Sequence, residues 1–406
     1  MKKKLLLVLM LMSVLFLLSA CKKKTDDNYG GVSTAEMQEL YNDEMQRAIE
    51  GKYKNLVVHP MKCNIDNIEK IYSVKVHKNT EYKNNTHKDN LEKMISTINN
   101  FFGKDFDTSI ISVRAIYNNE NDNDSEISIE EMKNQLDSGT FKADKYFILF
   151  GDAREKGGKG FAQIDSGFCN IWFSRGFIPA TMPMYEYSTK KVYNFAVSSD
   201  EINEEIKLQD GKITIKAAAE YVEKYLNEEL PFEKNEKYRF SVAEARVLEV
   251  DDQYALGFCV RKTYNGIPFD YTDGATSGIY VSDFEDERGE VCMINRNEID
   301  NICGLGEVQS WIENNGKEIE RIISLDDALE SVSKSIGDNS IYDVYGIEIV
   351  YQFVIDSTDE TGETTLGTPV WKIITQNKND NKYTCFYVDL KTGKVNHTYK
   401  NIYGTR

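Results

Sequence analysis

The segment from Glu120 to Glu131 carries oxygen-bearing side chains at the spacing of a calcium-binding loop. Oxygens fall at loop positions 1, 3, 5 and 9, and Glu131 stands at position 12, where a bidentate carboxylate completes such a site. Two departures oppose this interpretation, because Glu120 replaces the usual Asp and Ser125 replaces the turn glycine. Ser128 and Glu131 also form a capping box, so a solvated loop that leads into a helix explains the same residues. We predict no metal or cofactor here, with calcium as the alternative.

Motifs for phosphate or nucleophilic chemistry are incomplete in this sequence. The Gly-Gly-Lys-Gly stretch at 157–160 lacks the Ser or Thr that follows the lysine of a phosphate-binding loop, so it is interpreted as a tight turn. Gly-x-Ser-x-Gly is missing, and no His-Glu-x-x-His pattern includes any of the four histidines, His59, His77, His87 and His397. We predict no catalytic residues. A pair of carboxylates remains the alternative, since 66 acids offer many candidate pairs.

The amino terminus has the layout of a bacterial export signal that ends at a cysteine. Three lysines precede an apolar run from Leu5 to Leu18, which is shorter than the roughly 20 residues of a spanning helix. The sequence Leu-Ser-Ala-Cys at 18–21 resembles the lipobox, in which the cysteine thiol carries diacylglycerol. We predict a signal peptide at 1–20, a lipidated tether at 21–32 and lipidation of Cys21. The lipid would hold the chain on the extracytoplasmic face of the cell membrane.

The net charge indicates which partners to expect, and the length indicates how many domains. Removal of the leader, whose only charged residues are Lys2, Lys3 and Lys4, takes the formal net charge from −17 to −20. A chain this acidic lacks the basic face that nucleic-acid binding requires, so no nucleic-acid partner is expected. A chain of 406 residues is longer than a single hydrophobic core usually accommodates, so two or three domains are expected.

Six cysteines follow Cys21, and their spacing fixes no disulfide pairing. Export would permit disulfides, with Cys292 and Cys303 as the nearest pair. No Cys-x-x-Cys motif indicates a zinc or redox site. Cys259 and Cys385 lie in apolar, strand-like stretches, so most of these thiols are expected to act as small buried hydrophobic side chains.

Residues 33–205 are predicted to form an N-terminal α+β domain. Helical spacing and caps predict helices from Ser33 or Thr34 to about Glu50, at 88–102 and at 129–136. Alternation and turn residues predict strands at 68–77, 110–117, 145–150, 161–164, 168–173, 183–187 and 192–197.

The C-terminal half contains an internal duplication. Each copy is an amphipathic helix, opened by Thr214 or Ser324, and four strands follow it. The first copy comprises 214–226, 238–250, 254–264, 278–283 and a strand entered through 289–291. The second comprises 324–336, 345–355, 370–375, 385–389 and a strand entered through 393–395.

The second copy resembles the PepSY-like domains of exported bacterial proteins, in which a helix packs on an antiparallel, cystatin-like sheet. Their last hairpin reads aromatic-Val-Asp and then Thr-Gly-Lys-Val, as at 387–389 and 392–395 here. The first copy departs from this pattern, with Glu285 to Arg288 in place of Leu-Lys-Thr. The resemblance covers about half of the chain and implies PepSY-like repeats at 206–300 and 315–406.

By that resemblance, such domains regulate or inhibit partner proteins outside the cell and carry no catalytic residues. The expected fold is therefore α+β, with an N-terminal α+β domain and two helix-on-antiparallel-sheet repeats. The expected function is a non-enzymatic binding or regulatory module for a protein or peptide. Two alternatives are a surface hydrolase with carboxylates in a cleft of the N-terminal domain, and a solute-binding lipoprotein. The lack of alternating βα units argues against the second alternative.

Overall fold

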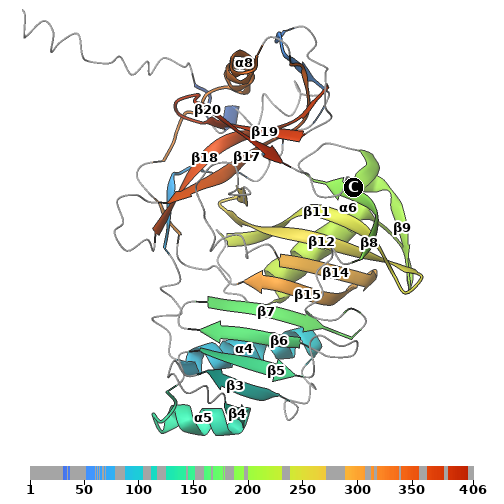
Figure 1. Ribbon diagram of the computed structural model, residues 1–406, viewed down its shortest axis with the longest axis vertical. Helices are drawn as coiled ribbons and strands as arrows, with labels where there is room; N and C mark the ends of the chain where they lie inside the picture. Colours follow the sequence, from blue (N-terminus) through green and yellow to red (C-terminus); the bar gives the residue numbers. More distant parts are fainter. Residues whose placement is uncertain are drawn as a thin grey trace, which may run out of the picture.

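The computed structural model (Figure 1) describes most of the chain between Gly31 and Lys400. The described residues are 31–33, 35–36, 52–59, 61, 63, 65, 68, 70–77, 87–103, 111–116, 125–142, 145–150, 160–165, 168–176, 178, 187–195, 200–230, 238–270, 289–306, 312–314, 318–337, 340–355, 364–378 and 383–400. Cys21 and its leader and tether lie outside these residues, as do most of the helix predicted to end near Glu50 and the strand predicted at 278–283. No described helix is both long and apolar enough to cross a membrane.

The fold is mixed α+β and rich in strands, which confirms the predicted class. Its first unit begins with α4 (His87–Phe102), which buries Leu91, Met94, Ile98 and Phe101 at helical spacing. Four antiparallel strands pair in chain order after it: β3 (Ser112–Ile116), β5 (Lys145–Phe150), β6 (Gly160–Asp165) and β7 (Phe168–Ser174). An inserted strand and helix, β4 (Ser125–Ser128) and α5 (Ile129–Asp137), follow β3. We call residues 87–174 the α4 unit.

The second unit repeats this order. A short hairpin, β9 (Glu205–Leu208) and β10 (Gly211–Thr214), leads into α6 (Ile215–Lys224), which ends in a π-helical turn, η4 (Tyr225–Glu229). Thr214 caps α6 because its hydroxyl accepts a hydrogen bond from the Ala217 amide at 3.1 Å. The strands are β11 (Tyr238–Val250), β12 (Gln253–Tyr264), β14 (Gly289–Asn295) and β15 (Glu298–Gly306). We call residues 214–306 the α6 unit.

A third unit, residues 324–400, has the same order of one helix followed by four strands, and we call it the α8 unit. Ser324 caps α8 (Leu325–Ser335) by accepting from the Asp327 amide at 3.1 Å. The strands that follow pair antiparallel in chain order: β17 (Tyr342–Ile355), β18 (Thr364–Asn377), β19 (Tyr383–Asp389) and β20 (Val395–Lys400). Gly393 has a φ of 66° in the last turn, as the Thr-Gly pair predicted.

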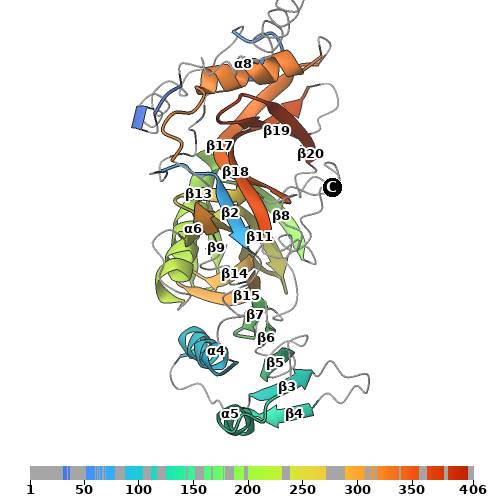
Figure 2. The same cartoon turned by 90° about the vertical axis from the view of Figure 1, so that its left-hand side faces the viewer.

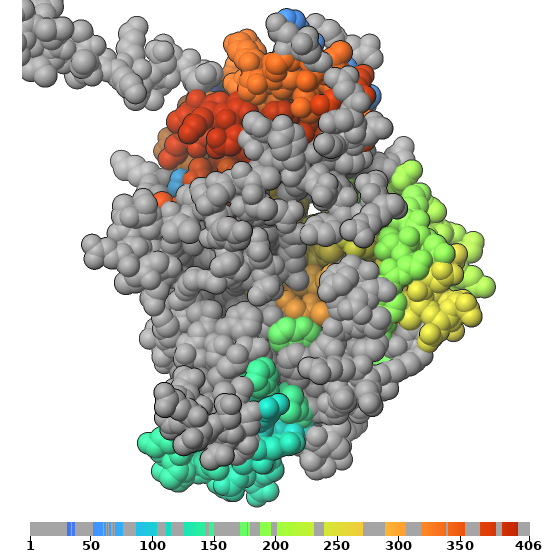
Figure 3. Space-filling model, in the orientation of Figure 1, coloured from blue at the N-terminus to red at the C-terminus, as the bar shows by residue number. Residues whose placement is uncertain are grey.

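Strands of the first two units and β8 (Ser188–Asn194), which lies between them in the sequence, form one long antiparallel sheet. Its strand order is β4-β3-β5-β6-β7-β15-β14-β12-β11-β8. The units join edge to edge where β7 pairs with β15. Figure 2 shows α4 and α6 on the same face of this sheet, and their buried side chains share one apolar core with the sheet residues beneath them. The α8 unit lies at one end of the molecule and the α4 unit at the other (Figure 3).

Segments from early in the chain complete the sheet of the α8 unit. Strand β1 (Leu56–Val58) pairs in parallel with β17, and β2 (Val74–His77) pairs with both β18 and β16 (Ile312–Asn314). The α8 core accordingly combines residues from 53–74 with residues from 319–390. Strand β13 (Ile267–Asp270) connects the sheets, since it pairs with β12 and with β17. The domain limits 33–205, 206–300 and 315–406 remain predictions.

Three local predictions differ from the structure. Of the strand predicted at 68–77, only β2 is a regular strand. Ile68 and Ile71 are buried but belong to an irregular segment before it. Residues 289–291 are part of strand β14, whereas the sequence placed them in the connection that leads into a strand. The turn lies instead at Arg296-Asn297, where two residues join β14 to β15. Strand β8 begins at Ser188 and ends at Asn194, earlier than the predicted 192–197.

The described cysteines are thiols, with no disulfide among Cys63, Cys259, Cys292, Cys303 and Cys385. All except the half-buried Cys259 are buried, which confirms their expected role as small hydrophobic side chains. Burial raises the pKa of the Cys292 thiol, so this side chain stays protonated at neutral pH.

Candidate functional site

A pocket of about 600 Å³ opens where the α4 unit meets the α6 unit. This volume lies within the usual range of small-ligand sites. Its lining is mainly polar and comes from α4, the end of β7, the β9–β10 turn, α6 with its π-helical turn, and the β14–β15 turn. The lining residues are Asn100, Arg175, Asp210, Tyr221, Tyr225, Glu229, Asn295, Asn297, Glu298 and Ile299. We call this site the Arg175 pocket.

Arg175 follows β7 directly and fastens the two units to each other. Its Nε donates to the Ile299 carbonyl at 2.9 Å, and an Nη2 hydrogen bond reaches the Phe101 carbonyl at the end of α4. The guanidinium also lies 4.8 Å from the centre of the Phe101 ring, within cation–π range. Glu298 approaches Nε at 3.5 Å. Arg175 is therefore held in one position by groups of both units, and its charge is already partly balanced.

Two tyrosines on α6 form the aromatic wall of the pocket. Tyr221 and Tyr225 are four residues apart, which places them on one helix face, and their ring centres are 6.4 Å apart. Tyr221 donates from its hydroxyl to the Asn297 carbonyl at 2.6 Å. Burial, and then the nearby Glu229 carboxylate, raises the pKa of Tyr221. Burial also raises the pKa of Tyr225, so both phenols stay protonated at neutral pH.

Two carboxylates of the pocket, Asp210 and Glu298, have fixed partners. Asp210 accepts from the Arg296 amide at 2.9 Å, a bond that lowers the pKa of Asp210 despite the opposing effect of burial. Glu298 faces Arg175 and also accepts from the Asn295 amide at 3.1 Å. A general acid for glycoside hydrolysis needs a raised pKa, which the Asp210 contacts oppose. The arrangement is better suited to binding than to proton transfer.

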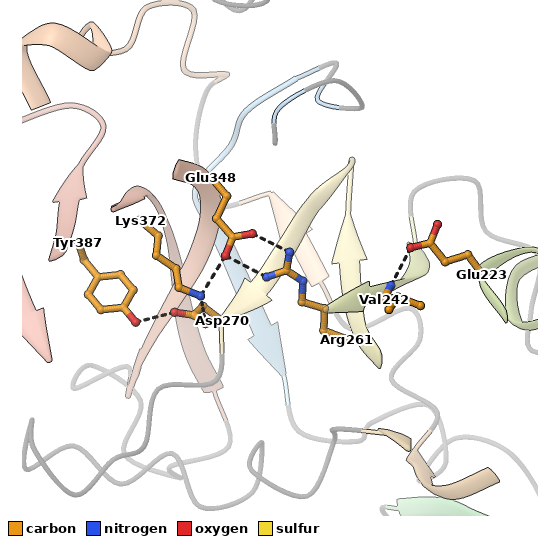
Figure 4. A network of polar contacts seen from close by, with 7 residues as sticks. All are labelled: Glu223, Val242, Arg261, Asp270, Glu348, Lys372 and Tyr387. Atoms are coloured by element: carbon orange, nitrogen blue, oxygen red, sulfur yellow. Dashed lines mark hydrogen bonds and ion pairs between the residues drawn. The ribbon is translucent and has the colours of Figure 1, made fainter. Parts of the chain in front are cut away.

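A second group of charges lies buried between the α6 and α8 units (Figure 4). Arg261 of β12 donates to both carboxylate oxygens of Glu348 on β17, at 3.1 and 2.6 Å. Lys372 of β18 lies 3.0 Å from Glu348 and 2.9 Å from Asp270 of β13. The Tyr387 hydroxyl donates to Asp270 at 2.7 Å. We call these five residues the ionic network.

The ionic network is balanced, with two cations and two anions. Burial alone would raise the pKa of Glu348, but the charges of Arg261 and Lys372 outweigh it and lower the pKa to about 2. Glu348 is fully buried, and the other side chains are nearly so. This geometry indicates a structural connection between two sheets rather than a site that a ligand reaches.

The other residues singled out in the sequence do not converge on a site. Residues 120–124 and 157–159 lie outside the described part of the chain. Ser128 caps α5 as predicted, accepting from the Glu131 amide at 3.1 Å, while the Glu131 carboxylate accepts from Gln135 instead of completing the capping box. Of the histidines, His87 begins α4 and packs against Phe141 and Tyr146, His59 contacts Asp343 at 2.9 Å, and His397 lies in β20. Within the described ranges no three His, Cys, Asp or Glu side chains form a potential metal site.

Sequence reasoning missed the lining of the Arg175 pocket. Tyr221 and Tyr225 lie in a helix that was predicted, and their spacing of four residues signals a shared face. Nothing local connects them to Asp210 or Asn297, which lie in the turns of two separate hairpins, and Arg175 reaches the site only when β7 pairs with β15.

Comparisons with known proteins add little to this geometry. No family model matches the chain, and neither does any curated protein. Among solved structures, the chain is similar to the Bacillus megaterium YpeB C-terminal domain, with 9% sequence identity and a TM-score of 0.30. That similarity covers 78% of this chain and 99% of the YpeB domain. At this identity and score it supports no inference about a ligand.

Proposed function

We propose that this protein is a non-enzymatic binding module, anchored by lipid on Cys21 to the extracytoplasmic face of the membrane, and that it binds a protein or peptide at the Arg175 pocket. The pocket is the observation that carries the proposal. Four of its lining side chains, those of Arg175, Asp210, Tyr221 and Glu298, are already held by hydrogen bonds or ion pairs. Such preorganisation reduces the entropic cost of binding.

The repeated element order supports the regulatory part of this proposal. In our proposal, the α6 and α8 units are PepSY-like repeats, each with a Ser- or Thr-capped helix followed by four antiparallel strands. The α4 unit has the same order with β4 and α5 inserted. The α4 and α6 units, joined edge to edge, form a long scaffold, and their junction provides a cleft for a partner.

The anchor is tested by Cys21→Ser. We expect this variant to leave the membrane fraction, because the lipid attaches to the cysteine thiol and the remaining basic residues bind membranes only weakly. The measurement is the distribution of the chain between membrane and soluble fractions, together with the intact mass of its mature amino terminus. Cys259→Ser serves as the control and should stay at the membrane. An unmodified amino terminus at another residue would contradict the anchor.

The binding site is tested by placing a photo-reactive benzophenone side chain at Tyr221 in the full chain. We expect irradiation of intact cells to give one discrete cross-linked species whose attachment point maps to the pocket. The control position is Ile341, which is 44% exposed in the α8 unit. The same products from both positions would show random collision and would refute a partner at the Arg175 pocket.

A further inference from the structure

The Arg175 pocket carries more negative than positive charge. Three carboxylates, Asp210, Glu229 and Glu298, line it, and Arg296 and Arg175 balance the first and the last of them. Arg175 is engaged by two backbone carbonyls and by Glu298, so its attraction for an additional anion is reduced. The net charge of the lining therefore favours a positively charged ligand. The whole chain has a formal net charge of −17, which also attracts a positively charged ligand as it approaches the protein.

Glu229 is the carboxylate best placed to meet such a ligand. It is exposed at the end of the π-helical turn, and no ion pair joins it to another residue of the described part of the chain. It lines the same pocket as Tyr221, and, after burial, its charge is the next cause that raises the pKa of Tyr221. Asp210 and Glu298, by contrast, are already bonded to arginines.

The aromatic wall complements this charge. The Tyr221 ring is half-buried and can face a ligand, while Tyr225, only 6% exposed, packs beside it with its ring at 30° to that of Tyr221. Tyrosine faces attract ammonium and guanidinium groups. Aromatic rings with an adjacent carboxylate are a recurring way to bind the cationic end of a side chain. Asn100 and Asn297 add amide groups that can bind a peptide backbone.

We infer that the Arg175 pocket binds the cationic side chain of a lysine or arginine within a peptide segment of the partner. This inference rests on the proposed function and names the ligand class of the same site. In this arrangement the cation lies between Glu229 and the accessible part of the Tyr221 ring. Because the interaction is electrostatic and near the surface, added salt weakens it.

The test uses two blocked peptides of equal length, acetyl-Gly-Lys-Gly-amide and its norleucine counterpart, titrated into the full chain by NMR or calorimetry. We expect the lysine peptide to bind about tenfold more tightly, which corresponds to one ion pair plus one cation–π contact. Glu229→Gln should remove most of this preference. Glu228→Gln is the matched control, because Glu228 is equally exposed and adjacent but does not line the pocket.

Equal affinity for the two peptides, or no measurable binding of either, would overturn the ligand class. Equal effects of Glu229→Gln and Glu228→Gln would also overturn it, since lysine would then be bound outside the pocket. A specific cross-link at Tyr221 together with either result would leave the proposed binding function standing. Failure of the inference and failure of the proposed function are therefore distinguishable.

Discussion

Glu348→Gln is expected to lower the free energy of unfolding by about 3–5 kcal/mol. Glutamine keeps the shape of the side chain but removes the charge that Arg261 and Lys372 share. Both cations would remain buried with only Asp270 as a counter-charge, and an uncompensated buried charge is costly because it cannot regain its water. Urea unfolding followed by circular dichroism measures the loss.

The matched control for this variant is Glu330→Gln. Glu330 pairs with Lys334 at 2.6 Å, but these side chains are 56% and 73% exposed. An exposed pair one helical turn apart contributes about 0.3–0.5 kcal/mol. Equal losses for the two variants would show that water reaches the ionic network and that it does not support the junction between the sheets.

The pH dependence of the same variant gives a second measurement. The pKa of Glu348 is lowered from 4.5 to about 2 in the folded chain. A lowered pKa contributes stability that is fully present above the unfolded-state value and is lost as the pH falls through the folded-state value. The wild type should therefore lose about 3 kcal/mol from this group between pH 5 and pH 2. Glu348→Gln lacks this contribution, so its free energy of unfolding should fall less than that of the wild type over the same pH range.

Local signals predicted the elements of the fold well. Capping residues marked three helix starts, because Ser128, Thr214 and Ser324 each accept the amide hydrogen bond that a helix leaves unsatisfied. Alternation and turn glycines predicted most described strands to within a few residues. These features depend on neighbours a few positions away, so they are visible in the sequence.

Pairings between distant segments were not predictable in this way. Strand β1 lies next to β17, nearly 300 residues later in the sequence, and no local pattern specifies that contact. The third copy of the helix-and-strand order was hidden for a related reason. The insertion of β4 and α5 after β3 breaks the spacing that made the other two copies recognisable.

The alternation of apolar and charged residues around Glu348 did not indicate that its carboxylate is buried. Glu348 stands between Ile347 and Ile349, a pattern that normally indicates a charged side chain facing water. In the structure Glu348 is buried, and its partners are Arg261 of β12 and Lys372 of β18, while Asp270 of β13 pairs with Lys372. A strand covered on both faces and carrying a charge needs countercharges from elsewhere, and the sequence alone does not say where they come from.

Trp371→Ala is expected to cost about 3–5 kcal/mol, through the largest fully buried side chain in the α8 core. The indole fills the space between the sheet and α8, and its Nε1 donates to the Ile323 carbonyl at 3.2 Å. Alanine would leave a cavity and an unpaired carbonyl. Trp371→Phe keeps most of the apolar contact and should cost less, about 1–3 kcal/mol. Tyr254→Ala, at a side chain 46% exposed, should change stability by less than about 0.5 kcal/mol.

Hydrogen exchange in the Trp371→Ala variant shows which segments depend on the α8 core. Leu56 and Val58 of β1 belong to the same core as Trp371, and the Tyr342 amide donates to the Asn55 carbonyl at 3.0 Å. A cavity at Trp371 should therefore accelerate hydrogen exchange in β1 as well as in β17, although β1 is remote in sequence. Exchange in α4 should change less, since α4 packs in the other core. Unchanged protection in β1 would mean that the early segment is held by its strand pairing alone, without the shared core.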